Sequence, residues 1–204
     1  MVFEKKELIF GQPFIQEDLD GVFFNIGVDS FFQVNPQGIK ELYQTIKKEA
    51  ALNKEKSVLD LFCGVGSIGI FLAKEAKHVF GVELHQAIVD AAITNAENNK
   101  VNNITFFAED TRRFLNLKAQ GYKNIDCIVL NPPRSGLSKK IIRAVLRLEP
   151  EVIFYSSCNP KSMMEDLSGL VGEYELDFIE PFDFFPHTPH LECLVKMERN
   201  RPKG

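Results

Sequence analysis

The stretch SVLDLFCGVGSIG, residues 57–69, decides the fold of this chain. It begins with a short apolar run and continues into three glycines, Gly64, Gly66 and Gly69, at the spacing GxGxxG. Glycines at this spacing let the backbone turn tightly and lie close to a ligand. The stretch therefore predicts a strand, a glycine loop that binds a ligand, and a helix that starts near Ser67.

Short apolar strands alternate with helical patterns after this stretch. Such an alternation predicts βαβ units, and hence an α/β fold with a doubly wound, mostly parallel, Rossmann-like sheet. The last two runs are both strand-like, which predicts an antiparallel strand pair at one side of the sheet. We expect strands at residues 57–62, 78–83, 104–110, 125–131 and 152–157, helices at residues 67–76, 85–99, 138–150 and 160–172, and final strands at residues 174–182 and 191–198.

The N-terminal part differs from this pattern. Residues 7–16 and 22–35 are rich in aromatic and β-branched residues, with turn residues between them, so we predict a strand-rich extension over residues 1–35. A helix then opens at Pro36, with Ile39, Leu42 and Ile46 on one face. The main domain is expected over residues 36–204.

Composition limits the classes of function. The 204 residues carry a net charge of −4, so a module that binds nucleic acid by electrostatics alone is excluded, and an RNA-binding role needs a local basic patch or a further domain. The start of the chain does not resemble a signal peptide, and no apolar run is long enough to span a bilayer. The four cysteines lack disulfide or metal spacing, which favours reduced thiols in a cytoplasmic protein.

Three acidic residues surround the predicted ligand site. Asp60 precedes the glycines, Glu83 ends the next strand, where it could accept hydrogen bonds from ribose hydroxyls, and Asp110 ends the third. A carboxylate beside the glycine loop repels a pyrophosphate but suits a cationic amine. This favours S-adenosylmethionine over a nicotinamide dinucleotide, although an oxidoreductase remains an alternative.

The fourth strand ends in Asn131-Pro132-Pro133-Arg134. An Asn/Asp-Pro-Pro-aromatic tetrad at this place is similar to that of methyltransferases that act on exocyclic amines. Arg134 replaces the aromatic residue, so an amine target is less favoured but stays an alternative. Arg134 is also a candidate to contact a phosphate or the target base.

The fifth strand ends in a cysteine, in the run IFYSSCNP, residues 153–160. Asn159-Pro160 starts a helix, whose N-terminus favours a thiolate at Cys158. Cysteine is also commonly buried in a core. Methylation of carbon 5 of uracil requires a thiolate that adds to carbon 6 and a base that removes the carbon-5 proton. Glu192, at the start of the last strand, is a candidate for that base.

With these motifs, the chain resembles the S-adenosylmethionine-dependent RNA uracil-5-methyltransferases, which make 5-methyluridine in transfer and ribosomal RNA. The matching stretches occur in order over nearly the whole chain: FFQVNP, VLDLFCGVGSIGI, GVELHQAIVDAAITNAENN, IVLNPPRSGL, YSSCNP and FPHTPHLECLVKMER. The resemblance implies Cys158 as nucleophile and Glu192 as base. It also implies, together with the glycine loop at Gly64, cofactor contacts from Gln33, Phe62, Ser67, Glu83, Asp110 and Asn131.

The chain departs from the family in two ways. Asn131 stands where the family often has Asp, which questions any role there that needs a negative charge. The family's small β-barrel RNA-binding domain and iron–sulfur cysteines do not occur in the sequence, so we expect a catalytic domain from a longer protein or a short form. A silent fragment that binds S-adenosylmethionine or RNA remains a further alternative.

The expected partner is structured RNA, with ribosomal RNA favoured over transfer RNA. Phe31 is a candidate to stack on a base, although core packing explains it equally well. Lys139, Arg143 and Arg147 share one helical face that is either solvated or in contact with phosphates. No metal site is expected, because His187, His190 and Cys193 have no fourth ligand nearby in sequence, so a Pro-containing loop accounts for them.

Overall fold

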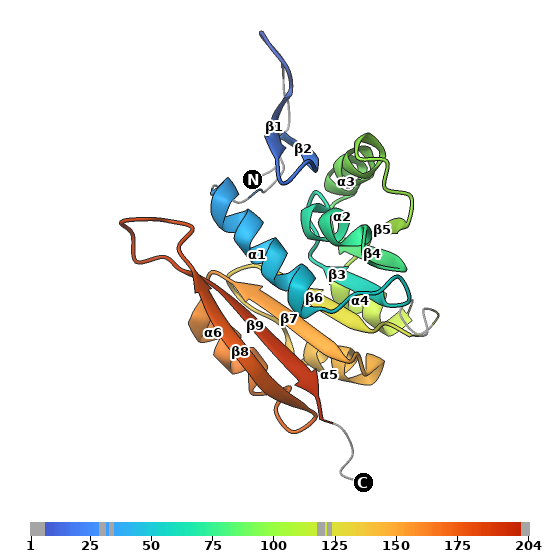
Figure 1. The fold of residues 1–204 in the computed structure, drawn as a ribbon, viewed down its shortest axis with the longest axis vertical. Coiled ribbons are helices and arrows are strands. Elements are labelled where there is room, and N and C mark those ends of the chain that lie inside the picture. The colour runs from blue at the N-terminus through green and yellow to red at the C-terminus, as the bar shows by residue number, and fades with distance from the viewer. Residues whose placement is uncertain (1–6, 29–31, 33–34, 118–120, 122–123, 201–204) are drawn as a thin grey trace.

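The fold was analysed in a computed structural model that describes residues 7–28, 32, 35–117, 121 and 124–200. A twisted sheet forms the centre, with helices on both faces and a small hairpin at one end (Figure 1). The predicted α/β fold with a mostly parallel sheet is confirmed. The strands are β1 (Phe14–Asp18), β2 (Phe23–Gly27), β3 (Ser57–Leu61), β4 (His78–Glu83), β5 (Ile104–Ala108), β6 (Cys127–Leu130), β7 (Val152–Ser157), β8 (Tyr174–Phe182) and β9 (Glu192–Arg199).

The main sheet has seven strands in the order β5-β4-β3-β6-β7-β9-β8. The first five are parallel, and the reversal of strand order between β3 and β6 is the place where ligands bind in such sheets. β9 is antiparallel to both β7 and β8, which confirms the predicted C-terminal pair. The start of β9 therefore lies at the edge of the sheet where the parallel strands end.

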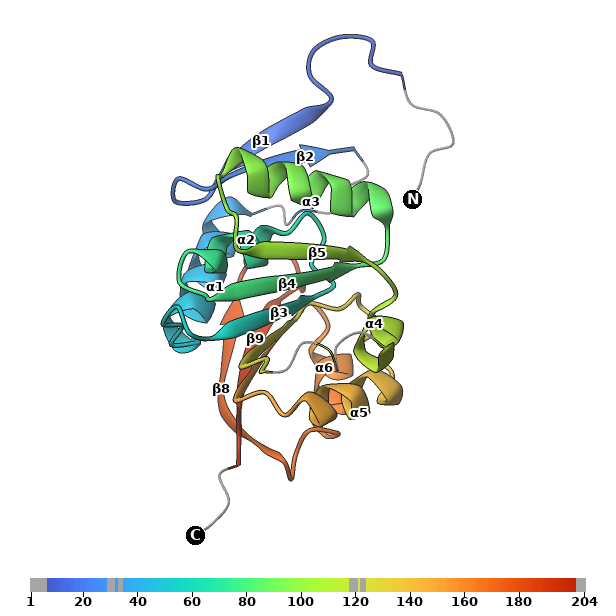
Figure 2. The same cartoon turned by 90° about the vertical axis from the view of Figure 1, so that its right-hand side faces the viewer.

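The helices divide between the two faces of the sheet, as the two views show (Figures 1 and 2). α1 and α2 pack with the hairpin in one hydrophobic cluster, and α4, α5 and α6 pack in the other. The strands between them are buried on both sides, which explains their continuous apolar runs. The helices are α1 (Pro36–Glu49), α2 (Ser67–Ala73), α3 (Gln86–Asn98), α4 (Thr111–Leu117), α5 (Lys139–Leu148) and α6 (Pro160–Leu167).

The N-terminal prediction is wrong in its boundaries. Residues 7–13 form no strand, and the antiparallel hairpin pairs β1 with β2 only. Gly11 has a φ of +86° and Pro13 has no backbone N–H, so a paired strand begins only after Pro13. β2 ends at Gly27, short of the predicted residue 35.

Asn95 of α3 and Asn99, which caps the C-terminus of α3, hold the hairpin against that helix. The Asn95 side chain accepts from the amide of Asn25 (2.8 Å) and donates to the carbonyl of the same residue (3.3 Å). Asn99 does the same with Phe23, at 2.8 Å and 2.6 Å. Each amide side chain thus pairs with β2 as a neighbouring strand would. The boundary predicted after residue 35 stays a prediction.

The structure offers no candidate for a membrane span. Within its described part, no helix combines the length and the apolar character needed to cross a bilayer.

Candidate active site

The glycine loop joins β3 to α2 in a left-handed backbone conformation. Phe62, Gly64 and Gly66 have φ values of +63°, +55° and +79°. A Cβ on Gly66 would lie 2.6 Å from the ring of Phe106, whereas a Cβ on Gly64 would meet nothing within 4 Å. Gly66 is therefore required by packing, while the backbone at Gly64 faces open space where a ligand could approach. A φ above zero at Phe62 is uncommon for a bulky residue and marks the loop as strained.

Asp60 lies beneath this loop and is fully buried. Its Oδ2 accepts a hydrogen bond from the amide of Gly69 at 3.0 Å. Its Oδ1 has no hydrogen-bond partner among the described residues. Burial, together with the nearby Glu83 carboxylate, raises the pKa of Asp60 to about 7, against the lowering effect of the Gly69 amide. A carboxylate in this state would gain from a cationic partner.

Glu83 and Ser67 lie on the two sides of the glycine loop. Glu83 Oε2 accepts from the Gly64 amide at 3.3 Å, and its Oε1 accepts from the Leu84 amide at 2.8 Å. The Ser67 hydroxyl is 2.7 Å from the hydroxyl of Tyr43, a buried residue of α1. Both predicted side chains are thus held in place, and each keeps lone pairs for a ligand. In the sequence, Tyr43 appears only as an apolar position of a helical pattern.

Asp110 and Asn131 follow β5 and β6 on the same edge. Asp110 is exposed, and its Oδ1 accepts from the amide of Arg113 at 2.9 Å at the start of α4. Asn131 is half-buried, and its backbone N–H donates to the carbonyl oxygen of Leu61 at 3.4 Å. Asp110 therefore has a structural role at α4, and its second oxygen is the one that could contact a ligand.

The loop after Asn131 is tied to the loop that carries Cys158. The carbonyl oxygen of Arg134 accepts from Asn159 Nδ2 at 2.9 Å and from Ser162 Oγ at 3.2 Å. The guanidinium of Arg134 lies 3.3 Å from Nδ1 of His190, in the loop that leads to Glu192. Three loops far apart in sequence are therefore joined around one position.

The side chain of Asp166 in α6 holds the loop between β6 and α5 in place through hydrogen bonds. Its Oδ2 accepts from the Leu137 amide and from the hydroxyl of Tyr155, both at 2.7 Å. Gly136 has a φ of +74°, and a Cβ there would lie 2.5 Å from the same oxygen. The loop between β6 and α5 thus fits closely against α6. The sequence alone showed Asp166 only as a polar residue in a helical pattern.

Cys158 and Glu192 come together through the pairing of β7 with β9. The last registered pair of these strands is Ser157 with Cys193. Cys158 follows Ser157 and Glu192 precedes Cys193, so the two residues occupy facing positions one step beyond that pair. Cys158 is half-buried, whereas Glu192 is only 1% exposed. The predicted nucleophile and the predicted base are thus neighbours at the sheet edge.

The carboxylate of Glu192 has one partner. Its Oε1 accepts a hydrogen bond from Ser156 Oγ at 2.5 Å, and its Oε2 is buried without a partner among the described residues. Burial raises the pKa of Glu192, and the hydrogen bond from Ser156 opposes that rise. A carboxylate with a raised pKa and a free lone pair is suited to accept a proton near neutral pH.

Glu192 Oε2 and Asp60 Oδ1 share one unusual property. Within the part of the chain that the structure describes, they are the buried side-chain oxygens or nitrogens that lack a hydrogen-bond partner. Buried polar groups are normally paired, so each such atom calls for an explanation. Both belong to strands whose ends meet at one edge of the sheet, where a ligand would supply the partners.

The other predicted site residues are accounted for as follows. Gln33 and Phe31 lie outside the described residues. Phe32 is partly buried and packs against the core, with its ring centroid 6.0 Å from that of Phe24. Across the described residues, no group of three or more His, Cys, Asp and Glu could hold a metal ion, and His190 contacts Arg134 instead.

Comparison with known proteins shows the family of the chain. Residues 3–200 match the family described as tRNA (Uracil-5-)-methyltransferase. The chain belongs to the tRNA (uracil-5-)-methyltransferase family. This membership confirms the resemblance drawn from the motifs.

The curated relatives of the chain are named as RNA methyltransferases, which is consistent with the family. The chain is 39% identical over 197 residues to an uncharacterized RNA methyltransferase of Clostridium tetani, covering 96% of this chain and 42% of the relative. It is 37% identical over 196 residues to one of Listeria innocua, covering 94% of this chain and 43% of the relative. The chain therefore spans less than half the length of these curated relatives.

A solved structure of an archaeal protein has the same fold. The tRNA (uracil-54, C5)-methyltransferase of Pyrococcus abyssi, solved in complex with S-adenosyl-L-homocysteine, is 34% identical to this chain. The TM-score is 0.81, over 92% of this chain and 45% of that one.

Proposed function

We propose that this chain transfers a methyl group from S-adenosylmethionine to carbon 5 of a uridine in structured RNA. The observation that carries the proposal is a pair of buried carboxylate oxygens without a partner among the described residues, Asp60 Oδ1 and Glu192 Oε2. Their strands, β3 and β9, lie on either side of β7 in the sheet order, and β7 leads to the half-buried Cys158. One carboxylate suits a cationic methyl donor and the other suits a proton acceptor. Family membership and the Pyrococcus abyssi relative support the same reaction.

The residues around the glycine loop fit S-adenosylmethionine. This cofactor has a sulfonium and an ammonium group and no phosphate, so buried Asp60 and the acidic side chains of Glu83 and Asp110 suit it. The open space at Gly64 leaves room for the ligand beside the backbone. When bound, the cofactor would supply a methyl group as the electrophile. We propose Phe62, Gly64, Ser67, Glu83, Asp110 and Asn131, with Gln33, as its contacts.

Cys158 and Glu192 would act in sequence on the uracil ring. The Cys158 thiolate adds to carbon 6, and the electron pair of the 5,6 double bond moves toward the carbon-4 carbonyl as an enolate. Carbon 5 then attacks the methyl group, whose bond to sulfur breaks. Glu192 removes the proton from carbon 5, the double bond re-forms and the Cys158 thiolate leaves. The reaction requires the uridine to leave its stack to reach Cys158.

RNA that contains 5-fluorouridine tests this mechanism. Fluorine cannot leave carbon 5 as a proton does, so with S-adenosylmethionine present we expect a methylated covalent complex that survives denaturation. Mass spectrometry should place the bond at Cys158. Cys158→Ala should abolish the complex, and Cys193→Ala, which alters a buried thiol of β9, should retain it.

A second variant tests the base. Glu192→Gln should accumulate a covalent complex with ordinary uridine RNA, because the carbon-5 proton is no longer removed. Methyl transfer that persists in Cys158→Ala would instead indicate an amine target and would reject the mechanism. Transfer RNA and ribosomal RNA transcripts should both be used, because the preference for ribosomal RNA stays a prediction.

A further inference from the structure

Two neighbouring helices carry a concentration of positive charge in an acidic chain. The sequences of α4, TRRFLNL, and α5, KKIIRAVLRL, contain six cationic residues and no acidic one, whereas the whole chain has a net charge of −4. All six are exposed. We call this surface the basic face; it consists of Arg112, Arg113, Lys139, Lys140, Arg143 and Arg147.

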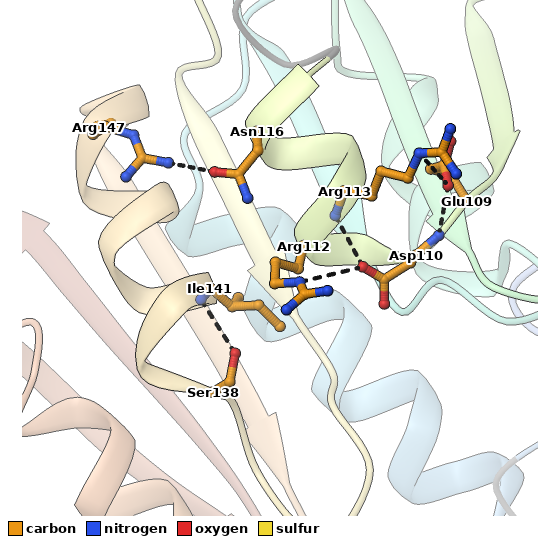
Figure 3. A network of polar contacts seen from close by, with 8 residues as sticks. All are labelled: Glu109, Asp110, Arg112, Arg113, Asn116, Ser138, Ile141 and Arg147. Carbon is orange, nitrogen blue, oxygen red and sulfur yellow. Dashed lines mark hydrogen bonds and ion pairs between the residues drawn. The ribbon is translucent and has the colours of Figure 1, made fainter.

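The helices of the basic face are fixed side by side (Figure 3). Arg147 Nη2 of α5 donates to Asn116 Oδ1 of α4 at 2.7 Å. Ile142, Ala144 and Val145 bury the opposite side of α5 in the core, so its charged side must face solvent. The cations are therefore presented on a rigid support, which lowers the entropy cost of binding an extended polyanion.

Little of this charge is neutralised within the chain. Arg112 is 4.0 Å from the exposed Asp110 and Arg113 is 3.7 Å from the half-buried Glu109, both long contacts made by exposed arginines (Figure 3). No carboxylate among the described residues pairs with the cations of α5. Exposed pairs of this length contribute little free energy, so a phosphate could replace the carboxylates at small cost.

The basic face is continuous with the candidate active site. α4 begins directly after Asp110, and α5 follows the loop that contains Asn131 and Arg134. Arg134 is itself exposed and is held beside the Cys158 loop through Asn159. α4 and α5 lie next to each other on one side of the sheet (Figure 2), and their exposed cations extend the positive charge of Arg134 away from the site.

We propose that the basic face binds the sugar–phosphate backbone of the RNA beside the target uridine. This inference rests on the proposed function and adds where the RNA lies. Arg134 would contact the phosphate nearest Cys158, and α5 would hold phosphates farther along the strand. The acidic remainder of the chain repels RNA, so the local charge would also orient the bound strand.

The test compares two variants that lose the same charge. Lys139→Gln/Lys140→Gln/Arg143→Gln removes half of the basic face and retains helix-forming residues. Lys48→Gln/Lys74→Gln/Lys77→Gln removes three exposed cations near the amino ends of the strands. The probe is an unmodified transfer RNA transcript, with binding measured between 50 and 300 mM salt and methyl transfer measured at saturating RNA.

We expect the basic-face variant to bind the transcript about 10- to 100-fold more weakly near 0.1 M salt, with a salt slope shallower by about 2 to 3. The matched variant should bind within about twofold of wild type, because its cations lie away from the RNA path. At saturating RNA, kcat of the basic-face variant should be unchanged, since none of its residues touches the reacting atoms.

Several results would overturn the inference. One is that the two variants have equal affinities and salt slopes for the transcript. Another is that the wild-type chain does not bind the transcript at 50 mM salt. The third is that the basic-face variant loses binding to anionic phospholipid vesicles but keeps its affinity for RNA. If the basic-face variant alone loses RNA binding but no protein methylates uridine, the surface stands and the proposed function fails.

Discussion

At the scale of single residues, the hydrogen bond from Ser156 to Glu192 sets the protonation of the proposed base. Burial raises the pKa of Glu192, and this bond opposes the rise, so Ser156→Ala should raise the pKa further. A base acts only when it is deprotonated. The rising limb of the pH profile of kcat should therefore move to higher pH.

Ser168→Ala is the control for Ser156→Ala. It removes a hydroxyl that lies away from the site and donates a hydrogen bond to the backbone carbonyl of Glu165. That profile should coincide with the wild-type one. A Ser156→Ala profile that keeps its position on the pH axis while kcat falls would assign Ser156 a merely structural role.

Asp60 should make the stability of the chain depend on pH. Its pKa is about 7 in the folded state, against an ordinary value of 3.8, so the folded state favours the protonated carboxyl. The associated stabilisation is fully present below about pH 4 and is lost as the pH rises through 7. Relative to Asp60→Asn, wild type should therefore lose up to about 1.4 kcal/mol per pH unit over this window.

Urea denaturation of both proteins at a series of pH values measures this difference. Parallel curves would show that the proton on Asp60 is not linked to folding. Saturating S-adenosylmethionine should reduce the pH dependence, because a cation beside Asp60 favours the charged form.

At the scale of elements, the hairpin is held to α3 by side chains that imitate a strand. Asn95→Ala would leave the amide and carbonyl of Asn25 and the carbonyl of Val65 without their partner. We expect a loss of about 2–4 kcal/mol in the free energy of unfolding and faster hydrogen exchange at residues 23–27. Asn98→Ala, an exposed change on the same helix, should cost nothing measurable.

The loop between β6 and α5 makes a second element-level prediction. Gly136 and Gly21 share a φ of +74°, but a Cβ on Gly136 would lie 2.5 Å from Asp166, and one on Gly21 would have open space. Gly21→Ala should therefore cost about 1 kcal/mol from backbone strain alone. Gly136→Ala should cost more and should also lower kcat, because the displaced loop carries Arg134. Equal costs in thermal unfolding would contradict this.

Boundaries and partners of elements were harder to predict than their type. The strands from Ser57 onward were predictable, because strands buried on both faces leave continuous apolar runs. The two strand-like runs of the N-terminal extension were predicted with wrong bounds, since Gly11 and Pro13 delay pairing until Phe14 and β2 is held by contacts with α3 that local sequence does not encode. Asn95 was read as one residue of a helical face, although its partners lie 70 residues away.

At the scale of the whole molecule, Lys196 links the far edge of the sheet to α1. This buried residue of β9 lies 2.8 Å from both Asp177 of β8 and Glu198, and 3.7 Å from Glu49 of α1. Lys196→Met would leave these carboxylates without their cation. We expect a loss of about 1 kcal/mol near pH 7, because the carboxylates are partly exposed and stay solvated, and less at pH 3, where they gain protons.

Lys74→Met is the control for this prediction, because it removes an exposed lysine from the end of α2. Both proteins should be compared by urea denaturation at the two pH values. A Lys196→Met loss that is the same at pH 3 as at pH 7 would indicate a packing defect in place of an electrostatic one.

The candidate site was predictable as a set of strand ends but not as a network. Parallel strands bring their carboxyl ends to one edge, so Asp60, Glu83 and Cys158 could be placed together from the strand pattern alone. The contacts that hold the site, such as Asp166 with Leu137, depend on how α6 packs. The periodicity of a sequence does not predict how a helix packs. The contacts of Asp166, Tyr43 and Ser156 with the site were therefore seen only in the structure.

The position of β9 also has a consequence for biosynthesis. β9 lies between β7 and β8 in the sheet, although it is made after both. On the ribosome, β8 therefore has no partner in the sheet until residues 192–199 have emerged, and Glu192 arrives on that same strand. A nascent chain can display Cys158 long before it has the proposed base. Under the proposed mechanism, the order of translation would thus keep the chain inactive until β9 is inserted.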